Sequence, residues 1–177
     1  MLLSHSQIKA LVNRGVVEHA NEEAINAASL DVHLGPLILV EPIMGTVLDY
    51  TARDKPNWHT VDIRYGSYIL KPGEFILAQT VEVFNLPNNI SAEYKLKSSM
   101  ARIGLEHMNA GWCDAGWHGS VLTLEFKNMS RVNSIRLRPG DAIGQLVFFQ
   151  HEPVEDSASY ATRGRYNQDK TVSTIKE

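Results

Sequence analysis

Residues 71–90, KPGEFILAQTVEVFNLPNNI, carry the pattern that decides the fold class. Residues 71–74 (KPGE) have the composition of a turn, and the apolar run 75–78 (FILA) that follows is typical of a strand. Residues 86–89 (LPNN) give a second turn signal, and another strand is predicted from Ile90 onward. Turn signals that enclose short apolar runs indicate β structure in this part of the chain.

The same pattern extends in both directions from this stretch. Residues 138–141 (RPGD) are typical of a turn, which leads into the apolar run 143–149 (IGQLVFF). Toward the N-terminus, Leu30, Val32 and Leu34 alternate with polar residues, which is the period of a strand. Many short strands separated by Gly and Pro predict an all-β fold of the jelly-roll or β-barrel type.

One short helix is predicted at the N-terminus, over residues 5–14. Ser4 and Gln7 have the spacing of a capping box, and Gly15 closes the segment. A chain of 177 residues is expected to form a single domain over residues 1–177. Two segments lack periodicity: residues 49–60, an expected excursion between strands, and residues 153–177, an expected flexible tail.

The composition narrows the function classes. A formal net charge of −3 argues against bulk electrostatic binding to nucleic acid or to an anionic membrane. The single cysteine, Cys113, excludes an internal disulfide framework and fits a reducing compartment. No apolar stretch approaches the ~20 residues of a membrane span, and the first residues lack the pattern of a signal peptide. A cytoplasmic location is therefore expected.

Residues 97–102 (KSSMAR) place two hydroxyls beside two cations. A short helix starting here would direct free N–H groups and the Ser99 hydroxyl at an anion, with Lys97 and Arg102 supplying positive charge. The alternatives are that Ser98 and Ser99 only cap a helix and that Arg102 only forms a surface ion pair. Two cations on one turn repel each other unless an anion is expected, which favours phosphate binding.

A carboxylate interrupts the apolar run 121–126 (VLTLEF). Glu125 is a candidate functional acid because carboxylates are rarely buried without a partner or a role. The alternative is an outward-facing position on an edge strand. Asp114 is either functional or a turn residue, and Trp112 and Trp117 are either core or interface residues or part of a site.

The spacing of the histidines and the single cysteine argues against a zinc site. Only His107 of the seven histidines lies among the motifs, and the other six show no metal-ligand spacing. Zinc-dependent nucleobase deaminases need an H-x-E segment and a C-x-x-C pair, and this chain has neither. Any deamination here would therefore activate water without zinc. In the tail, a set of polar residues is suited to closing over a phosphorylated ligand: Arg163, Arg165, Tyr166 and Gln168.

Four motifs together resemble those of the deoxycytidine triphosphate (dCTP) deaminase family: KSSMARIGL, NAGWCDAGWHG, LTLEF and RPGDAIGQLVF. The resemblance extends over the whole chain, and it implies the distorted jelly-roll fold that this family shares with the all-β dUTPases. It also implies a homotrimer with active sites at the subunit interfaces. Mg²⁺ would be bound through the nucleotide triphosphate, with no metal ligands from protein side chains and no zinc.

The resemblance also implies roles for individual residues. Glu125 is similar to the family's general acid/base, Ser98 to the hydroxyl that positions the attacking water, and Arg102 to the cation at the reacting centre. Asp114 resembles the acid that binds the deoxyribose 3′-hydroxyl. The implied substrate contacts are Lys97, Ser99, His107, Asn109, Ala110, Gly111, Asp114, Trp117, Arg165, Tyr166 and Gln168.

Three functions remain open on the sequence. The first is a deaminase that converts dCTP to deoxyuridine triphosphate (dUTP) and ammonia, favoured because Ser98, Arg102 and Glu125 are all present. The second is a bifunctional enzyme that continues to deoxyuridine monophosphate (dUMP) and diphosphate, or a plain dUTPase. The stretch from Ala110 to Asp114 (AGWCD) resembles the bifunctional members more than the pure deaminases, which tend to carry a bulkier His-Arg pair within it. The third is a non-catalytic nucleotide-binding trimer.

Overall fold

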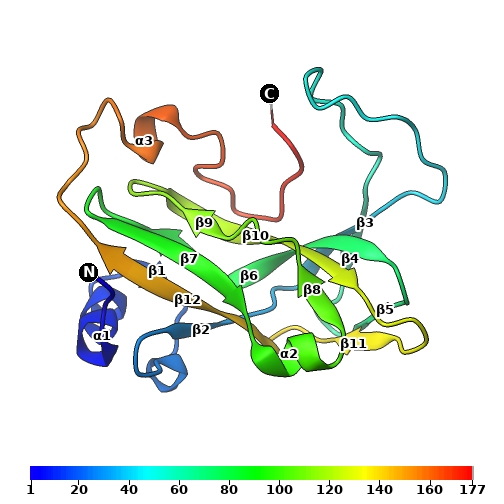
Figure 1. Cartoon of the computed structure of the whole chain (residues 1–177), viewed down its shortest axis with the longest axis horizontal. Helices are drawn as coiled ribbons and strands as arrows, with labels where there is room; N and C mark the ends of the chain where they lie inside the picture. The colour runs from blue at the N-terminus through cyan, green and yellow to red at the C-terminus, as the bar shows by residue number, and fades with distance from the viewer. Residues whose placement is uncertain (177) are drawn as a thin grey trace.

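The computed structural model describes residues 1–176, in which every strand pairing is antiparallel (Figure 1). The helices are α1 His5–Asn13, η1 Glu22–Ala24, α2 Ser98–Arg102 and α3 Tyr160–Arg163. The strands are β1 Val17–Glu18, β2 Leu30–His33, β3 Leu37–Val40, β4 His59–Asp62, β5 Tyr68–Leu70, β6 Phe75–Asn85, β7 Ile90–Leu96, β8 Leu105–His107, β9 Trp112–Cys113, β10 His118–Asn128, β11 Ile135–Leu137 and β12 Ala142–Gln150. The predicted all-β class is confirmed.

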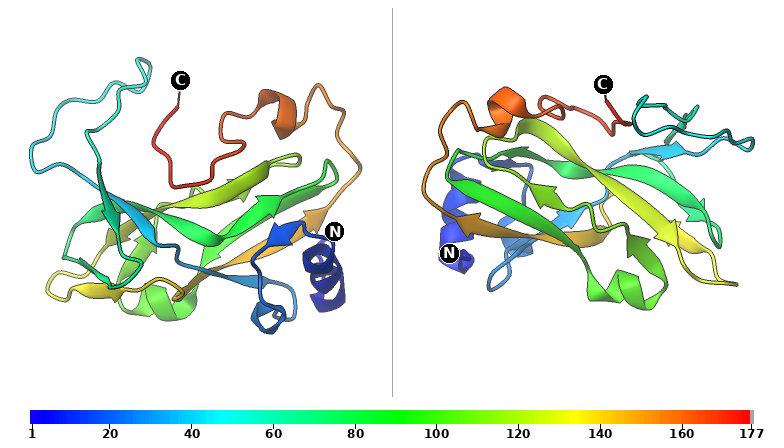
Figure 2. Two further views of the ribbon diagram at one scale, coloured as in Figure 1. Left: turned by 180° about the vertical axis from the view of Figure 1, so that it is seen from behind. Right: turned by 45° about the horizontal axis from the view of Figure 1, so that its top comes forward.

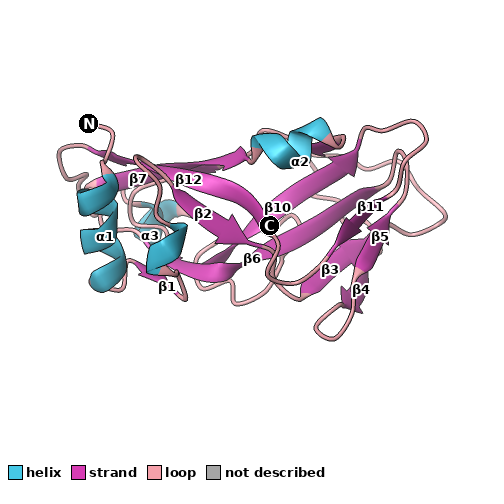
Figure 3. Cartoon of the chain, turned by 90° about the horizontal axis from the view of Figure 1, so that it is seen from below, coloured by secondary structure: helices cyan, strands magenta, loops and turns pink. Residues whose placement is uncertain are grey.

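The strands form three sheets. The largest has the order β4-β3-β6-β10-β8, with β1 also paired to β6, and the second has the order β2-β12-β7-β9. A two-stranded ribbon joins β11 and β5. The two larger sheets lie along the length of the molecule, with α1 at one end and the β4, β5 and β11 strands at the other (Figure 3).

The helix α1 forms where the capping box predicts it. The Ser4 backbone N–H donates to the Gln7 side chain over 3.0 Å, and both halves of the capping box are present. Ile8 and Leu11, one helical turn apart, are the buried residues of this helix. Gly15 follows with a φ of 73°, a left-handed conformation that glycine adopts without strain.

The two larger sheets share one apolar core. Phe84 of β6, Phe126 of β10 and Phe148 of β12 have no exposed surface and belong to the same buried cluster. Burying a phenylalanine side chain stabilises a fold by roughly 1.5–3 kcal/mol, so these three rings are major contributors to holding the sheets together. The long strands β6 and β10 form the centre of this arrangement.

Two irregular segments lie on the same side of the molecule (Figure 2). The first connects β3 to β4 over residues 41–58. Its predicted extent of 49–60 is wrong at both ends, because β3 already ends at Val40 and β4 begins at His59. The second is the tail from residue 153, which contains the short helix α3 and then returns over β10. No helix of residues 1–176 is long and apolar enough to cross a lipid bilayer.

Candidate active site

The strand β10 directs Glu125 away from the apolar core. β10 is not an edge strand, because it pairs with β6 on one side and with β8 on the other, so the edge-strand interpretation is wrong. Register shifts interrupt the β6–β10 pairing near residues 118–120 and 121–123. Beyond these shifts, Leu124 and Phe126 have no exposed surface, whereas the Glu125 side chain keeps 26% of its surface. Alternation along the strand therefore places Glu125 on the opposite face from the core.

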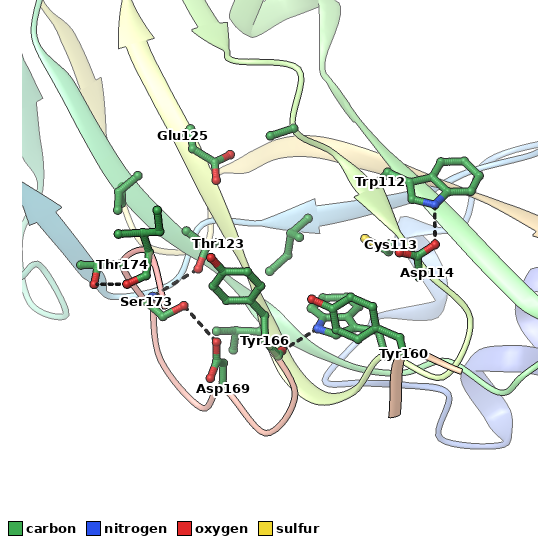
Figure 4. Close-up of a pocket in the computed structure, with 16 residues that line it drawn as sticks. Trp112, Cys113, Asp114, Thr123, Glu125, Tyr160, Tyr166, Asp169, Ser173 and Thr174 are labelled. Carbon is green, nitrogen blue, oxygen red and sulfur yellow. Dashed lines mark hydrogen bonds between the residues drawn. The ribbon is translucent and has the colours of Figure 1, made fainter. Parts of the chain in front are cut away.

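A cavity of about 450 Å³ lies in front of Glu125 (Figure 4). One wall is β10, a second is the segment from residue 110 to residue 117, and the tail forms a third. The tail is held there by hydrogen bonds from its backbone, including Val172 N–H to the Gln79 side chain over 2.8 Å. The lining residues are Leu77, Ala110, Trp112, Cys113, Asp114, Trp117, Val121, Leu122, Thr123, Glu125, Tyr160, Tyr166, Asp169, Ser173, Thr174 and Ile175.

The closest ionisable neighbour of Glu125 is His107 of β8. His107 Nε2 lies 3.3 Å from Glu125 Oε2, and the imidazole is 5% exposed. The two atoms are not aligned, and neither makes a hydrogen bond to any described residue although both are enclosed. Leaving such a buried polar atom unsatisfied costs about 1–3 kcal/mol. Groups of this kind in a native fold call for a functional explanation.

Electrostatic effects also mark this region of the fold. The pKa of Tyr94 is raised above its ordinary value. Burial is the larger cause, and the nearby negative charge of Glu125 is the smaller one. The pKa of the Cys113 thiol is raised to about 12, mainly by burial and to a smaller extent by the negative charge of Asp114. Cys113 is therefore a protonated, buried thiol at neutral pH, which agrees with its interpretation as an inert apolar residue.

Asp114 and the two tryptophans occupy different environments. Trp117 is 5% exposed, stacks on Phe84 and donates from Nε1 to the Tyr166 carbonyl over 2.8 Å, so it is a core residue that also lines the cavity. Trp112 is 58% exposed, and its Nε1 donates to Asp114 Oδ1 over 2.9 Å. Asp114 also closes a turn, because its carbonyl accepts from Trp117 N–H. Asp114 is therefore a turn residue, and its side chain also lines the cavity.

The segment 108–111 is shaped by close backbone contacts. The Met108 N–H donates to the Glu125 carbonyl, and Asn109 has a left-handed φ of 58°. The Gly111 carbonyl accepts from Tyr94 N–H over 2.8 Å, and a Cβ on Gly111 would lie 2.6 Å from the Tyr94 carbonyl oxygen. Ala110 is the member of this segment that lines the cavity.

A second cavity of about 580 Å³ lies beyond Asp114. It shares Asp114, Tyr160 and Tyr166 with the first cavity, and Arg163 and Arg165 contribute positive charge to its wall. The second cavity therefore places cationic side chains on one side of Asp114. Gln168 lines neither cavity, because its backbone N–H binds the His118 carbonyl and its side chain lies against Gly119.

The helix α2 lies on the opposite side of the molecule from the tail (Figures 1 and 2). Its N-cap residue is Lys97, with no side-chain cap, so the helix-cap interpretation of Ser98 and Ser99 is wrong. The Lys97 ammonium pairs with the Asp31 carboxylate of β2. The argument from two unpaired cations is therefore wrong for Lys97, whose charge is already compensated within the protomer. Arg102 lines a separate groove on this side of the molecule.

The structure thus brings only part of the predicted site residues together. Ala110, Asp114, Trp117, Glu125 and Tyr166 line one cavity, and the residues of α2 lie apart from it. Several lining residues were not predicted: Thr123, Tyr160, Asp169 and Ser173. Thr123 could have been found, because it shares its strand face with Glu125 two residues later. The tail residues carry no periodic signal.

Within residues 1–176, no three His, Cys, Asp or Glu side chains come together where they could hold a metal ion. Mg²⁺ is commonly bound through substrate phosphates with few protein ligands, so the donor set is compatible with Mg²⁺ carried by a triphosphate.

The family model and the similar sequences all concern dCTP deaminases. Residues 2–151 match the family model described as dCTP deaminase-like. A protein of Methanospirillum hungatei named "dCTP deaminase, dUMP-forming" is 38% identical over 155 residues, which cover 86% of this chain and 83% of the relative. A protein of the same name from a Sulfurihydrogenibium species is 34% identical over 169 residues, covering 94% of this chain and 91% of the relative.

The solved structures agree on the fold. The 2′-deoxycytidine 5′-triphosphate deaminase of Agrobacterium tumefaciens superimposes with a TM-score of 0.66 at 26% identity. The match covers 83% of this chain, and it spans about half (48%) of the Agrobacterium chain. The dUTPase of Streptococcus mutans superimposes with a TM-score of 0.51 at 16% identity over 77% of this chain and 88% of its own, which supports the dUTPase-like fold alone.

Proposed function

The chain belongs to the dCTP deaminase-like family, and we propose that it converts dCTP to dUMP, diphosphate and ammonia. The observation that carries the deamination is the placement of Glu125 in the wall of a largely apolar cavity, with one oxygen enclosed and the side chain partly exposed. The presence of Ser98, Arg102 and Glu125 in the sequence favours deamination to dUTP as the first prediction. The names of the relatives favour the bifunctional alternative, which we adopt.

The deamination needs one group that moves protons in sequence. The Glu125 carboxylate takes a proton from water as the water oxygen bonds to C4 of cytosine, and the electron pair of the C4=N3 bond moves to N3. N3 receives that proton. Glu125 then takes the proton of the new hydroxyl and delivers it to the amino group, and the C–N bond breaks to release ammonia. General acid–base catalysis of this kind contributes ~10²–10⁴-fold in rate.

The remaining catalytic groups would come from a second protomer. Ser98 and Arg102 lie on α2, on the opposite side from the tail that covers Glu125. A homotrimer in which α2 of one protomer faces the cavity of its neighbour would unite the three groups. Ser98 would then hold the water, and Arg102 would stabilise charge around the tetrahedral centre. Ser99 would approach the phosphates from the same helix, whereas the Lys97 ammonium is held by Asp31.

Cleavage of the triphosphate is the second proposed reaction. Water attacks the α-phosphorus, the bond to the bridging oxygen of the β-phosphate breaks, and diphosphate leaves. Mg²⁺ bound to the phosphates would neutralise their charge during this step. The chain's own contribution is to bind and orient the phosphates through Arg165 and Tyr166 of the tail, at the wall of the second cavity.

The test follows ammonia and diphosphate separately while the purified protein acts on dCTP with Mg²⁺. Both products in equal amounts support the proposal. Ammonia alone indicates a deaminase that stops at dUTP, and tight binding with neither product indicates a nucleotide-binding trimer. Glu125→Gln should abolish ammonia release while dCTP binding, measured by calorimetry, persists. An active Glu125→Gln enzyme would refute the role of the carboxylate.

A further inference from the structure

The side chain of His107 lies beside the Glu125 carboxylate. We propose that the His107 imidazole is a positioning residue, which donates from Nε2 to Glu125 Oε2 and so leaves Oε1 as the oxygen that exchanges protons with the substrate. This inference rests on the proposed deamination. The family resemblance implies His107 only as a substrate contact, and it implies no contact between its imidazole and Glu125.

The first argument comes from the two facing atoms. His107 Nε2 and Glu125 Oε2 are 3.3 Å apart, both are enclosed, and each lacks a hydrogen bond to any part of the chain that the structure describes. An N–H···O bond needs only a better angle and a slightly shorter separation. A small rotation of either side chain would therefore satisfy both groups at once.

The second argument comes from how firmly the imidazole is held. β8 pairs with β10 directly beside this position, and His107 is the register partner of Phe126. The ring packs against Tyr94 with centroids 4.5 Å apart and against Phe126 at 5.8 Å. A ring fixed by two aromatic neighbours is a rigid donor, and it can restrict rotation of the carboxylate that faces it.

The third argument concerns the two oxygens of Glu125. Oε2 is enclosed beside His107, whereas the side chain as a whole keeps 26% of its surface and lines the cavity. The exposed part includes Oε1, which makes no hydrogen bond within residues 1–176. Holding Oε2 would keep Oε1 directed at the cavity, where the proton transfers take place.

A purely structural role for His107 makes a different prediction, and two variants separate the roles. His107→Phe keeps a flat ring between Tyr94 and Phe126 but removes the donor. His107→Gln loses the ring but keeps an amide N–H near the position of Nε2. We expect His107→Phe to lower kcat for ammonia release roughly 10- to 100-fold with little change in the KM for dCTP, and His107→Gln to recover most of kcat. His59→Gln, on the exposed face of β4, is the matched control.

Two kinetic results would overturn the proposal. One is a His107→Phe enzyme with wild-type kcat, which would show that the ring only packs. The other is equal impairment of the Phe and Gln variants, which would show that the donor is irrelevant.

A readout without catalysis covers the case in which these variants do not fold. The ¹⁵N chemical shift of His107 Nε2 is measured at fixed pH in the wild type and in Glu125→Gln. We expect the His107 signal to move while the control His59 signal stays. An unmoved signal would contradict the contact. If the signal moves but the wild-type protein releases no ammonia, the proposed function is wrong, whereas the contact between His107 and Glu125 is supported.

Discussion

Replacing Gly111 with alanine tests whether close backbone packing positions the segment that places Ala110 at the cavity. The added Cβ would lie 2.6 Å from the Tyr94 carbonyl oxygen and 3.0 Å from the Tyr94 Cβ. A carbon–oxygen contact needs about 3.3 Å, so one partner must move by about 0.7 Å. Tyr94 lies inside β7, paired with β12, and is the less mobile partner. The segment with Ala110 should therefore move.

The expected cost follows from this displacement. A misplacement of about 1 Å near reacting groups can lower a rate ~10²-fold, so we expect Gly111→Ala to lower kcat roughly 10- to 100-fold. Forcing a methyl group into this contact should also destabilise the fold by about 1–3 kcal/mol. The assay is ammonia release at saturating dCTP, with thermal unfolding measured in parallel. Gly66→Ala is the control, because nothing lies within 4 Å of its Cβ position.

The result that would refute this reasoning is specific. A Gly111→Ala enzyme with wild-type kcat and wild-type Tm would show that the added methyl group is accommodated without movement. The approach of Gly111 to Tyr94 would then have no role in placing Ala110 beside the cavity. A loss of activity in Gly66→Ala as well would show that the effect is not particular to this contact.

The remaining predictions concern the tail, the thiol and the metal. Val172 is 8% exposed against Leu39 and Leu77, so Val172→Asp should release the tail, detected as faster proteolysis beyond residue 153 and a higher KM for dCTP; unchanged proteolysis would contradict this. Cys113 should resist iodoacetamide at pH 7. Because its pKa is raised from 9.0 to about 12, its contribution to stability is intact below pH 9 and is lost as pH rises toward 12, and Cys113→Ala should flatten that loss in urea unfolding. A zinc-specific chelator should leave activity unchanged, whereas removing Mg²⁺ should reduce it; the opposite pattern would exclude the metal assignment.

Elements with a strong local signal could be predicted from the sequence. The turns at residues 71–74 and 138–141 each precede a predicted strand, and the structure confirms these strands as β6 and β12. The capping box at Ser4 locates α1 within one residue. Strands β1 and β9 have two residues each, which is too short for a periodic pattern. The tail has little apolar sequence, and its docking depends on hydrogen bonds to β10 and Gln79 that no local pattern encodes.

Several residues that line the cavity could be predicted from the sequence, whereas the contacts between distant residues could not. Glu125 could be identified because a carboxylate in an apolar run is unusual, and the structure places it at a cavity. The pairing of β8 with β10 brings His107 to Glu125, and the β2 sheet brings Asp31 to Lys97. Both contacts join residues that are distant in the sequence, so local spacing carries no information about them. The charge of Lys97 was misjudged for this reason.

The most direct test of the account is subunit complementation. Ser98→Ala and Glu125→Gln should each be inactive, and the two variants are dissociated, mixed in equal amounts and reassembled. An intact site needs α2 from a Glu125→Gln protomer and the carboxylate from a Ser98→Ala protomer, so random assembly of a closed trimer should restore about one quarter of wild-type deamination. No recovery above the parent variants, in a sample shown by native mass spectrometry to contain mixed trimers, would contradict the claim that neighbouring protomers share each active site.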